Sequence, residues 1–222
     1  ALVHTWSPLP GHSPIPLSPH PPHFLSPLSP RSRPPLSRPV VVNGGLWLGD
    51  PDVDAVTRLC NDIDAVRYTR EGSFSLARGT WCPFNSQNTA LHRDVIPSYC
   101  LSPSVGRYDD IWGGYVTLAV AHHLDHAVAF GYPLVRQERN PHNYFRDHEA
   151  EKVGLEYTDT FVRWLQEEPL TGRDYRTCTE QLLAGLESRL AGGDVPEPLA
   201  AHVRGLVKSY RAWLAALARL AS

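Results

Sequence analysis

The sequence predicts an α/β protein. Three observations predict this class: a run of valines opens the globular part at 40–42, strand and helix patterns alternate to about residue 135, and the rest is helical. Of the 222 residues, 42% are hydrophobic and 20% are charged, with a formal net charge of -2. These proportions are typical of a soluble, folded protein.

Composition and charge exclude several classes of protein. No apolar run approaches the roughly 18 to 20 residues that cross a bilayer, and the N-terminus lacks the pattern of a signal peptide. Lys and Arg number 21 against 23 Asp and Glu, so no net positive field would attract nucleic acid. Cys60, Cys82, Cys100 and Cys178 are too scattered for metal knuckles or a disulfide scaffold, which favours a reducing, cytoplasmic compartment.

Residues 1–39 differ in composition from the rest. They contain 12 of the 21 prolines and no acidic residue. Because proline removes backbone donors and fixes φ, we predict a disordered or polyproline II segment. A linker, or a stretch foreign to the ancestral fold, is favoured over a ligand for an SH3-type groove.

The first predicted elements lie on either side of an acidic turn. The valines at 40–42 predict a short buried strand. The segment 49–52 is typical of a helix start, because Asp can accept a hydrogen bond from a free backbone N–H, and a helix of two to three turns follows. One or two strands are expected within 65–84, then a polar loop at 85–88, then a short helix near 92–97 that its proline stops.

The second half of the chain is mainly helical by the same criteria. The predicted elements are a helix over 111–126 with two acids at its start, a strand over 127–135, a polar loop to 148, and helices over 151–167, 174–190 and 196–220. The last two helices have a short connection, which predicts an antiparallel appendage at 169–222 after a domain at 40–168.

The acidic segment 50–54 contains an Asp-x-Asp pattern. Such a pattern can hold a divalent cation against a diphosphate, because hard cations prefer carboxylate oxygens. The competing interpretation is that Asp50 or Asp52 caps a helix and Asp54 lies in its first turn. Capping is favoured over metal binding.

One polar segment contains candidate substrate-binding residues. Asn85, Gln87 and Asn88 lie in an amide-rich stretch beside aromatic residues, which suits sugar hydroxyls and the apolar face of a sugar or base. A solvated turn explains the same stretch equally well.

The segment 106–115 places adjacent carboxylates at a helix start. Asp109 or Asp110 could accept a hydroxyl proton, hold a sugar hydroxyl or neutralise a metal, and the other would be the cap. Arg107 and Trp112 flank them as candidate substrate contacts.

The remaining patterns give weaker indications of a functional site. His122 and His126 have ligand spacing on a helix but no third partner, so a metal site is disfavoured. No Ser-His-Asp elbow, P-loop or GxGxxG fingerprint occurs.

Four blocks in order resemble a known family. Gly45-Leu46-Trp47, the segment 51–55, Gly79-Thr80 with Asn88 and Arg93-Asp94, and the segment 106–114 resemble the reversibly glycosylated polypeptides, the UDP-arabinopyranose mutases of glycosyltransferase family 75. The segments 83–89 and 110–112 are also similar to STELLO-type glycosyltransferases. The resemblance covers about residues 43–168.

The resemblance implies a GT-A-like sheet with flanking helices that binds a UDP-sugar, with Mn or Mg as cofactor. It implies that Asp109 and Asp110 lie at the active site, with Asn88 and Arg93 near the sugar. Three features of the family have no counterpart here: its nucleotide-binding strands, its metal-binding acids and its glycosylated Arg. A histidine that the family has further along the chain also has no clear counterpart, although His142 lies near the expected position. We therefore expect a truncated chain that lacks most metal ligands. The alternative is a non-catalytic module that assembles with itself or with a full-length relative.

Overall fold

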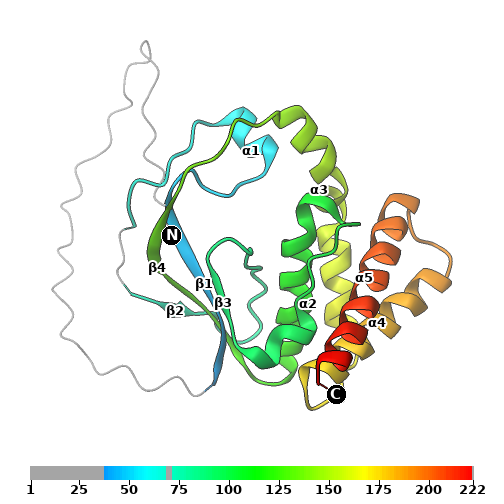
Figure 1. Ribbon diagram of the computed structural model, residues 1–222. Coiled ribbons are helices and arrows are strands. Elements are labelled where there is room, and N and C mark those ends of the chain that lie inside the picture. The colour runs from blue at the N-terminus through cyan, green and yellow to red at the C-terminus, as the bar shows by residue number, and fades with distance from the viewer. Residues whose placement is uncertain (1–37, 69–71, 222) are drawn as a thin grey trace, which may run out of the picture. The chain divides into compact units, whose positions relative to one another are not determined.

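A central pair of parallel strands organises the fold, which we describe from a computed structural model covering residues 38–68 and 72–221. β1 (Val40–Gly49) and β4 (Ala127–Gln137) pair in parallel along most of their length. The short β2 (Phe74–Ser75) and β3 (Thr89–Leu91) pair antiparallel at the two outer sides. The result is a mixed sheet of order β2-β4-β1-β3, seen at the left of Figure 1.

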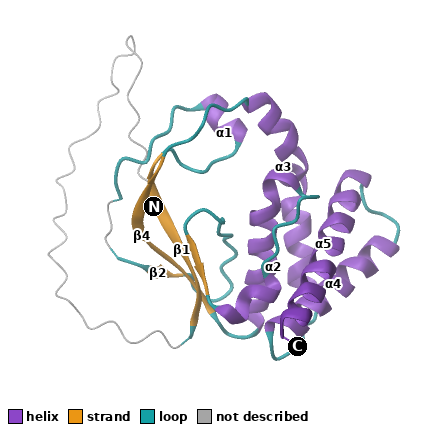
Figure 2. Cartoon of the chain, in the orientation of Figure 1, coloured by secondary structure: helices purple, strands orange, loops and turns teal. Residues whose placement is uncertain are grey.

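Helices follow the strands in an α/β arrangement. They are α1 (Ala55–Cys60), the 3-10 helices η1 (Arg93–Ser98) and η2 (Gly106–Tyr108), α2 (Asp109–His123), α3 (Tyr144–Glu167), α4 (Tyr175–Ala191) and α5 (Glu197–Ala221). Figure 2 shows α2 to α5 gathered on one side of the sheet. None of the helices in the described ranges is long and apolar enough to cross a membrane.

The core surrounds α2 and includes buried side chains of the sheet and of α3, α4 and α5. Trp112 is fully buried and stacks on Phe161 of α3, with ring centroids 4.2 Å apart. Gly114 of α2 packs against the backbone of Phe84, where an added Cβ would lie 2.9 Å from the carbonyl oxygen. Because α2 is enclosed by apolar neighbours, it is fixed as a rigid element, and so is its N-terminus.

The last two helices are joined to this core by buried polar contacts. The Tyr210 hydroxyl donates to the Ser98 carbonyl at 2.9 Å and accepts from the Cys100 amide at 3.4 Å. The Trp213 indole donates to the Ile96 carbonyl at 2.8 Å. Residues 38–222 form one compact unit, so the boundary predicted at 168/169 falls between elements that share a core.

Several predicted elements differ from the structure in detail. The first helix is only six residues long, and its cap is Asp54, which accepts from the Thr57 amide at 2.9 Å, so capping by Asp50 or Asp52 is wrong. The short helix predicted near 92–97 is confirmed as η1, which ends one residue after Pro97, but it is a 3-10 helix. The strand β3 was not predicted: it lies between the predicted polar loop at 85–88 and the following helix. The prediction for residues 1–39 lies almost wholly outside the described residues.

Replacing Tyr210 by Phe tests the attachment of α5. The change leaves the buried Cys100 amide without its acceptor, so we expect the free energy of unfolding to fall by about 1–3 kcal/mol in urea denaturation. Tyr132→Phe is the control, since Tyr132 is 43% exposed and should change stability by less than about 0.5 kcal/mol. Equal midpoints for the two variants would contradict the role of Tyr210.

Candidate functional site

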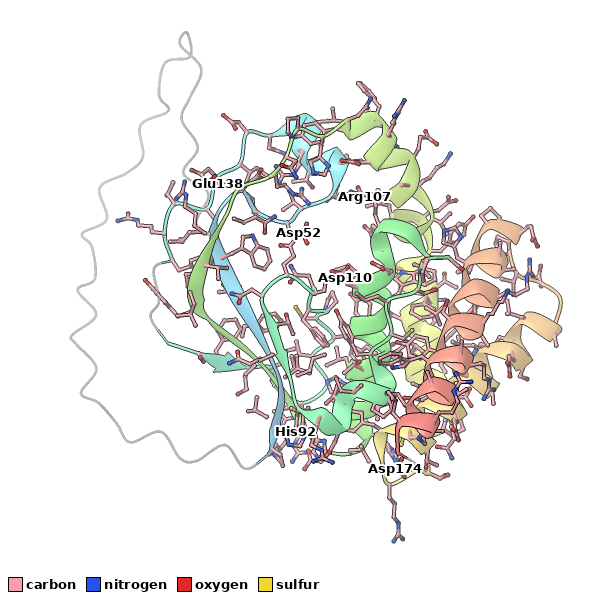
Figure 3. The ribbon with its side chains drawn as sticks, in the orientation of Figure 1. Asp52, His92, Arg107, Asp110, Glu138 and Asp174 are labelled. Atoms are coloured by element: carbon pink, nitrogen blue, oxygen red, sulfur yellow. The ribbon has the colours of Figure 1, made fainter. Side chains whose placement is uncertain are left out.

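The carboxyl ends of β1 and β4 meet at one edge of the sheet, and polar side chains follow both strands there. Asp52 comes shortly after β1 and Arg139 shortly after β4. The N-terminus of α2, with Asp110 in its first turn, lies across from them, and Figure 3 shows Asp52, Asp110 and Arg107 around the same opening. In α/β folds this edge of a parallel pair is where ligands bind.

A cavity of about 440 Å³ occupies this place. Its volume lies within the range of small-molecule sites. It is lined by Asp52, Val53, Asp54, Arg107, Tyr108, Asp110, Ile111, Tyr115, Glu151, Gly154, Leu155 and Thr158. The lining therefore combines carboxylates and an Arg with tyrosine rings and aliphatic side chains.

Asp110 is held by the amide-rich loop. Its Oδ2 accepts hydrogen bonds from the Ser86 amide at 3.0 Å and from the Ser86 hydroxyl at 3.1 Å. Among the described residues, no group is hydrogen-bonded to the other carboxylate oxygen, Oδ1. The residue is therefore fixed in orientation and keeps an acceptor for a ligand.

Asp52 connects three segments at the cavity wall. Its Oδ1 accepts a hydrogen bond from the Arg139 guanidinium at 2.9 Å, and its Oδ2 accepts one from the side-chain amide of Asn85 at 3.3 Å. The Gln87 side chain lies near the same carboxylate and lowers its pKa. Burial raises the pKa of Asp52, Arg139 opposes this rise, and the nearby negative charge of Asp110 adds to it.

Arg107 lies on the opposite wall, between two acids of α3. Its Nε donates to Glu151 at 2.8 Å, and its guanidinium pairs with Asp147 at 3.4 Å. The second oxygen of Glu151 accepts from the Ala55 amide at 2.7 Å, so this nearly buried carboxylate joins α1, η2 and α3. Arg107 is thus fixed in place with its charge already compensated.

The remaining wall of the cavity is aromatic and aliphatic. Gly154 allows the ring of Tyr108 to lie directly on α3, because a Cβ there would come within 2.1 Å of that ring. Burial, with the charges of Asp54 and Glu151, raises the pKa of Tyr108 to about 12. The phenol therefore stays protonated near neutral pH and can donate a hydrogen bond.

Of the predicted site residues, Asp110 and Arg107 line this cavity. Asn85 is hydrogen-bonded to Asp52 of its wall, and Gln87 lies near Asp52. Asp109 does not line the cavity: one of its oxygens accepts from the Asp110 amide at 2.8 Å, and burial raises its pKa.

Three other predicted substrate contacts lie apart from the cavity. Trp112 is fully buried and donates to the Thr158 hydroxyl at 2.9 Å, so it is a core residue and presents no ring face to a substrate. Asn88 donates to the Leu46 carbonyl at 2.9 Å and borders a smaller cavity of about 270 Å³. The Arg93 side chain is 92% exposed and lies 3.8 Å from Asp94.

The described residues do not form a metal centre. Within them, no three His, Cys, Asp or Glu side chains converge as metal ligands would. His122 packs edge-on against Trp81, and His126 is hydrogen-bonded to Tyr175 at 3.0 Å, so the two histidines face different partners. The divalent cation implied by the resemblance therefore has no set of three ligands among the described residues.

Sequence reasoning missed three residues of the site. Ser86 lies inside the amide-rich loop and could have been included with its neighbours. Arg139 follows a predicted strand, and the rule that parallel strands end at the same edge would have placed it near Asp52. Glu151 lies within a helix pattern and shows no sequence signal.

The fold and the cavity define a mixed α/β domain with an acidic cavity at the carboxyl ends of its parallel strands. A family model described as "Reversibly glycosylated polypeptide" matches residues 30–218. The chain belongs to the reversibly glycosylated polypeptide family.

Curated relatives match over part of their length. "Probable UDP-arabinopyranose mutase 1" of Solanum tuberosum is 28% identical over 134 residues, which are 58% of this chain and 36% of that protein. "UDP-arabinopyranose mutase 2" of Arabidopsis thaliana is 28% identical over 136 residues, 59% of this chain and 38% of that protein. "UDP-arabinopyranose mutase 3" of the same plant is 30% identical over 100 residues, 42% and 28% of the two chains. The chain thus spans little more than a third of the length of the first two.

Replacing Glu151 by Gln tests the contact that joins α1, η2 and α3. Loss of the charge weakens the hydrogen bonds to Arg107 and to the Ala55 backbone amide. We therefore expect the free energy of unfolding in urea to fall by about 1.5–3 kcal/mol. The Ala55 amide should also exchange its hydrogen faster. Glu149→Gln, an exposed position on the same helix, is the control. The assignment is wrong if both variants unfold like the wild type.

Proposed function

We propose that this chain binds a UDP-sugar in the cavity between Asp52 and Asp110, as part of an enzyme of the UDP-sugar mutase or glycosyl transfer type. The observation that supports this most is the cavity itself, which lies at the carboxyl ends of the parallel strands and carries Asp110 with a free acceptor oxygen. The relatives' names supply the ligand: UDP-arabinopyranose is the substrate that these names state.

The chemistry of the cavity suits the sugar half of such a ligand. Carboxylate oxygens accept hydrogen bonds from ring hydroxyls, and the tyrosine and leucine wall can pack against the apolar face of a ring. Asp110 can hold a hydroxyl or accept its proton during a reaction at the sugar. Its fixed orientation on Ser86 and a rigid helix means that little reorganisation is needed when the ligand arrives.

We further propose that the sheet and its flanking helices are part of a GT-A-like nucleotide-sugar domain. Family membership supports this, as do the parallel β1 and β4 with helices on one side. Because the chain spans about a third of the relatives, any divalent cation and the diphosphate contacts would be supplied mainly by residues that have no match here.

Replacing Asp110 by Asn tests this proposal. The change removes a charged acceptor, so we expect the affinity for UDP-arabinopyranose, measured by isothermal titration, to fall about tenfold or more. Asp109→Asn, the adjacent acid outside the cavity, should bind like the wild type and separates the two predicted catalytic residues. Absence of any binding by the wild-type chain would overturn the proposed function, and a larger loss in the Asp109 variant would overturn the assignment to Asp110.

A further inference from the structure

Two carboxylates that line the cavity, Asp110 and Asp52, do not cap a helix. Asp54, two residues later, caps α1 through both oxygens, which accept from the Thr57 amide at 2.9 Å and from the Thr57 hydroxyl at 2.6 Å. Asp52 has no such role. Its side chain is 24% exposed, lines the cavity, and lies near enough to Asp110 for the two charges to interact.

Keeping this carboxylate in place costs the fold free energy. Burial raises the pKa of Asp52, so the ionised form is disfavoured in the folded chain. The contribution of Asp52 to stability is therefore favourable below its unfolded pKa and is lost as the pH rises through the raised value. A charged group kept at such a place, with supporting hydrogen bonds from Arg139 and Asn85, is typical of a functional residue.

The partners of Asp52 favour hydroxyl groups over a metal ion as its ligand. The positive charge of Arg139 already compensates the carboxylate, and Arg139 is itself only 12% exposed. A divalent cation gains most from uncompensated carboxylates, whereas a hydroxyl needs only a lone pair. Each Asp52 oxygen retains accepting capacity beside its protein donors.

We propose that Asp52 is a substrate-binding residue and that, with Asp110, it binds hydroxyl groups of the sugar ring of a UDP-sugar, while Arg139 positions it. This inference rests on the function proposed above and names the second contact of that site. It also explains the ion pair between Asp52 and Arg139: the pair orients an acceptor where the loops after the two parallel strands meet.

The test compares UDP-arabinopyranose with UDP in isothermal titrations of the wild type, Asp52→Asn and Asp64→Asn. Asp64 is exposed and away from the cavity, so its variant controls for the lost charge. In Asp52→Asn we expect affinity for UDP-arabinopyranose to fall about tenfold or more, while affinity for UDP changes less than about twofold. Urea unfolding of all three proteins at pH 7 verifies that each variant is folded before titration.

The outcomes separate the two proposals. If the wild type binds no UDP-sugar, the proposed function fails and this inference fails with it. If the wild type binds but Asp52→Asn binds equally well, or loses UDP and UDP-arabinopyranose alike, only the role of Asp52 is overturned. An effect seen with Mn²⁺ and absent in EDTA would make Asp52 a cation ligand instead. Should Asp52→Asn not fold, Asp52→Glu, which keeps the charge but moves it by one methylene, must show the same selective loss.

Discussion

The parallel pairing of β1 with β4 is the constraint on which the site depends. Parallel strands end at the same edge, so the loops that follow them are brought together although they lie about 87 positions apart, the separation between Asp52 and Arg139. The ion pair between these residues then fixes both loops. Without that pairing, neither the acidic turn after β1 nor the polar loop after β4 would have a defined partner.

A second level of organisation fixes the opposite wall. α2 is enclosed by apolar neighbours, so its N-terminus, where Asp109 and Asp110 lie, has little freedom to move. Glu151 then joins η2 to α1 and α3. The site is thus built from rigid elements with short polar connections between them, an arrangement that keeps acceptor groups in place before a ligand arrives.

Much of the fold could be predicted from local patterns, and much of the site could not. Helices such as α2 and α5 have apolar spacing and end signals that depend on neighbouring residues only, so their positions were predicted closely. The site depends on contacts between distant segments: no local pattern shows that Asp52 meets Arg139. Trp112 was misjudged for the same reason. It follows Asp109 and Asp110 closely in sequence, but its neighbours in space are Phe161 and the rest of the core.

The adjacent acids of α2 show how one helix start can serve both structure and chemistry. The residue before the helix, Tyr108, makes no capping hydrogen bond from its side chain, so other groups accept from the amides of the first turn; the Gly106 carbonyl of η2 accepts from the Asp109 amide. Asp109 accepts from one of them, which leaves Asp110 to turn towards Ser86 and the cavity. The positive end of the helix dipole stabilises a negative charge at either position. Two adjacent carboxylates can therefore have different roles: Asp109 accepts from an amide of the first turn, and Asp110 is available to the cavity.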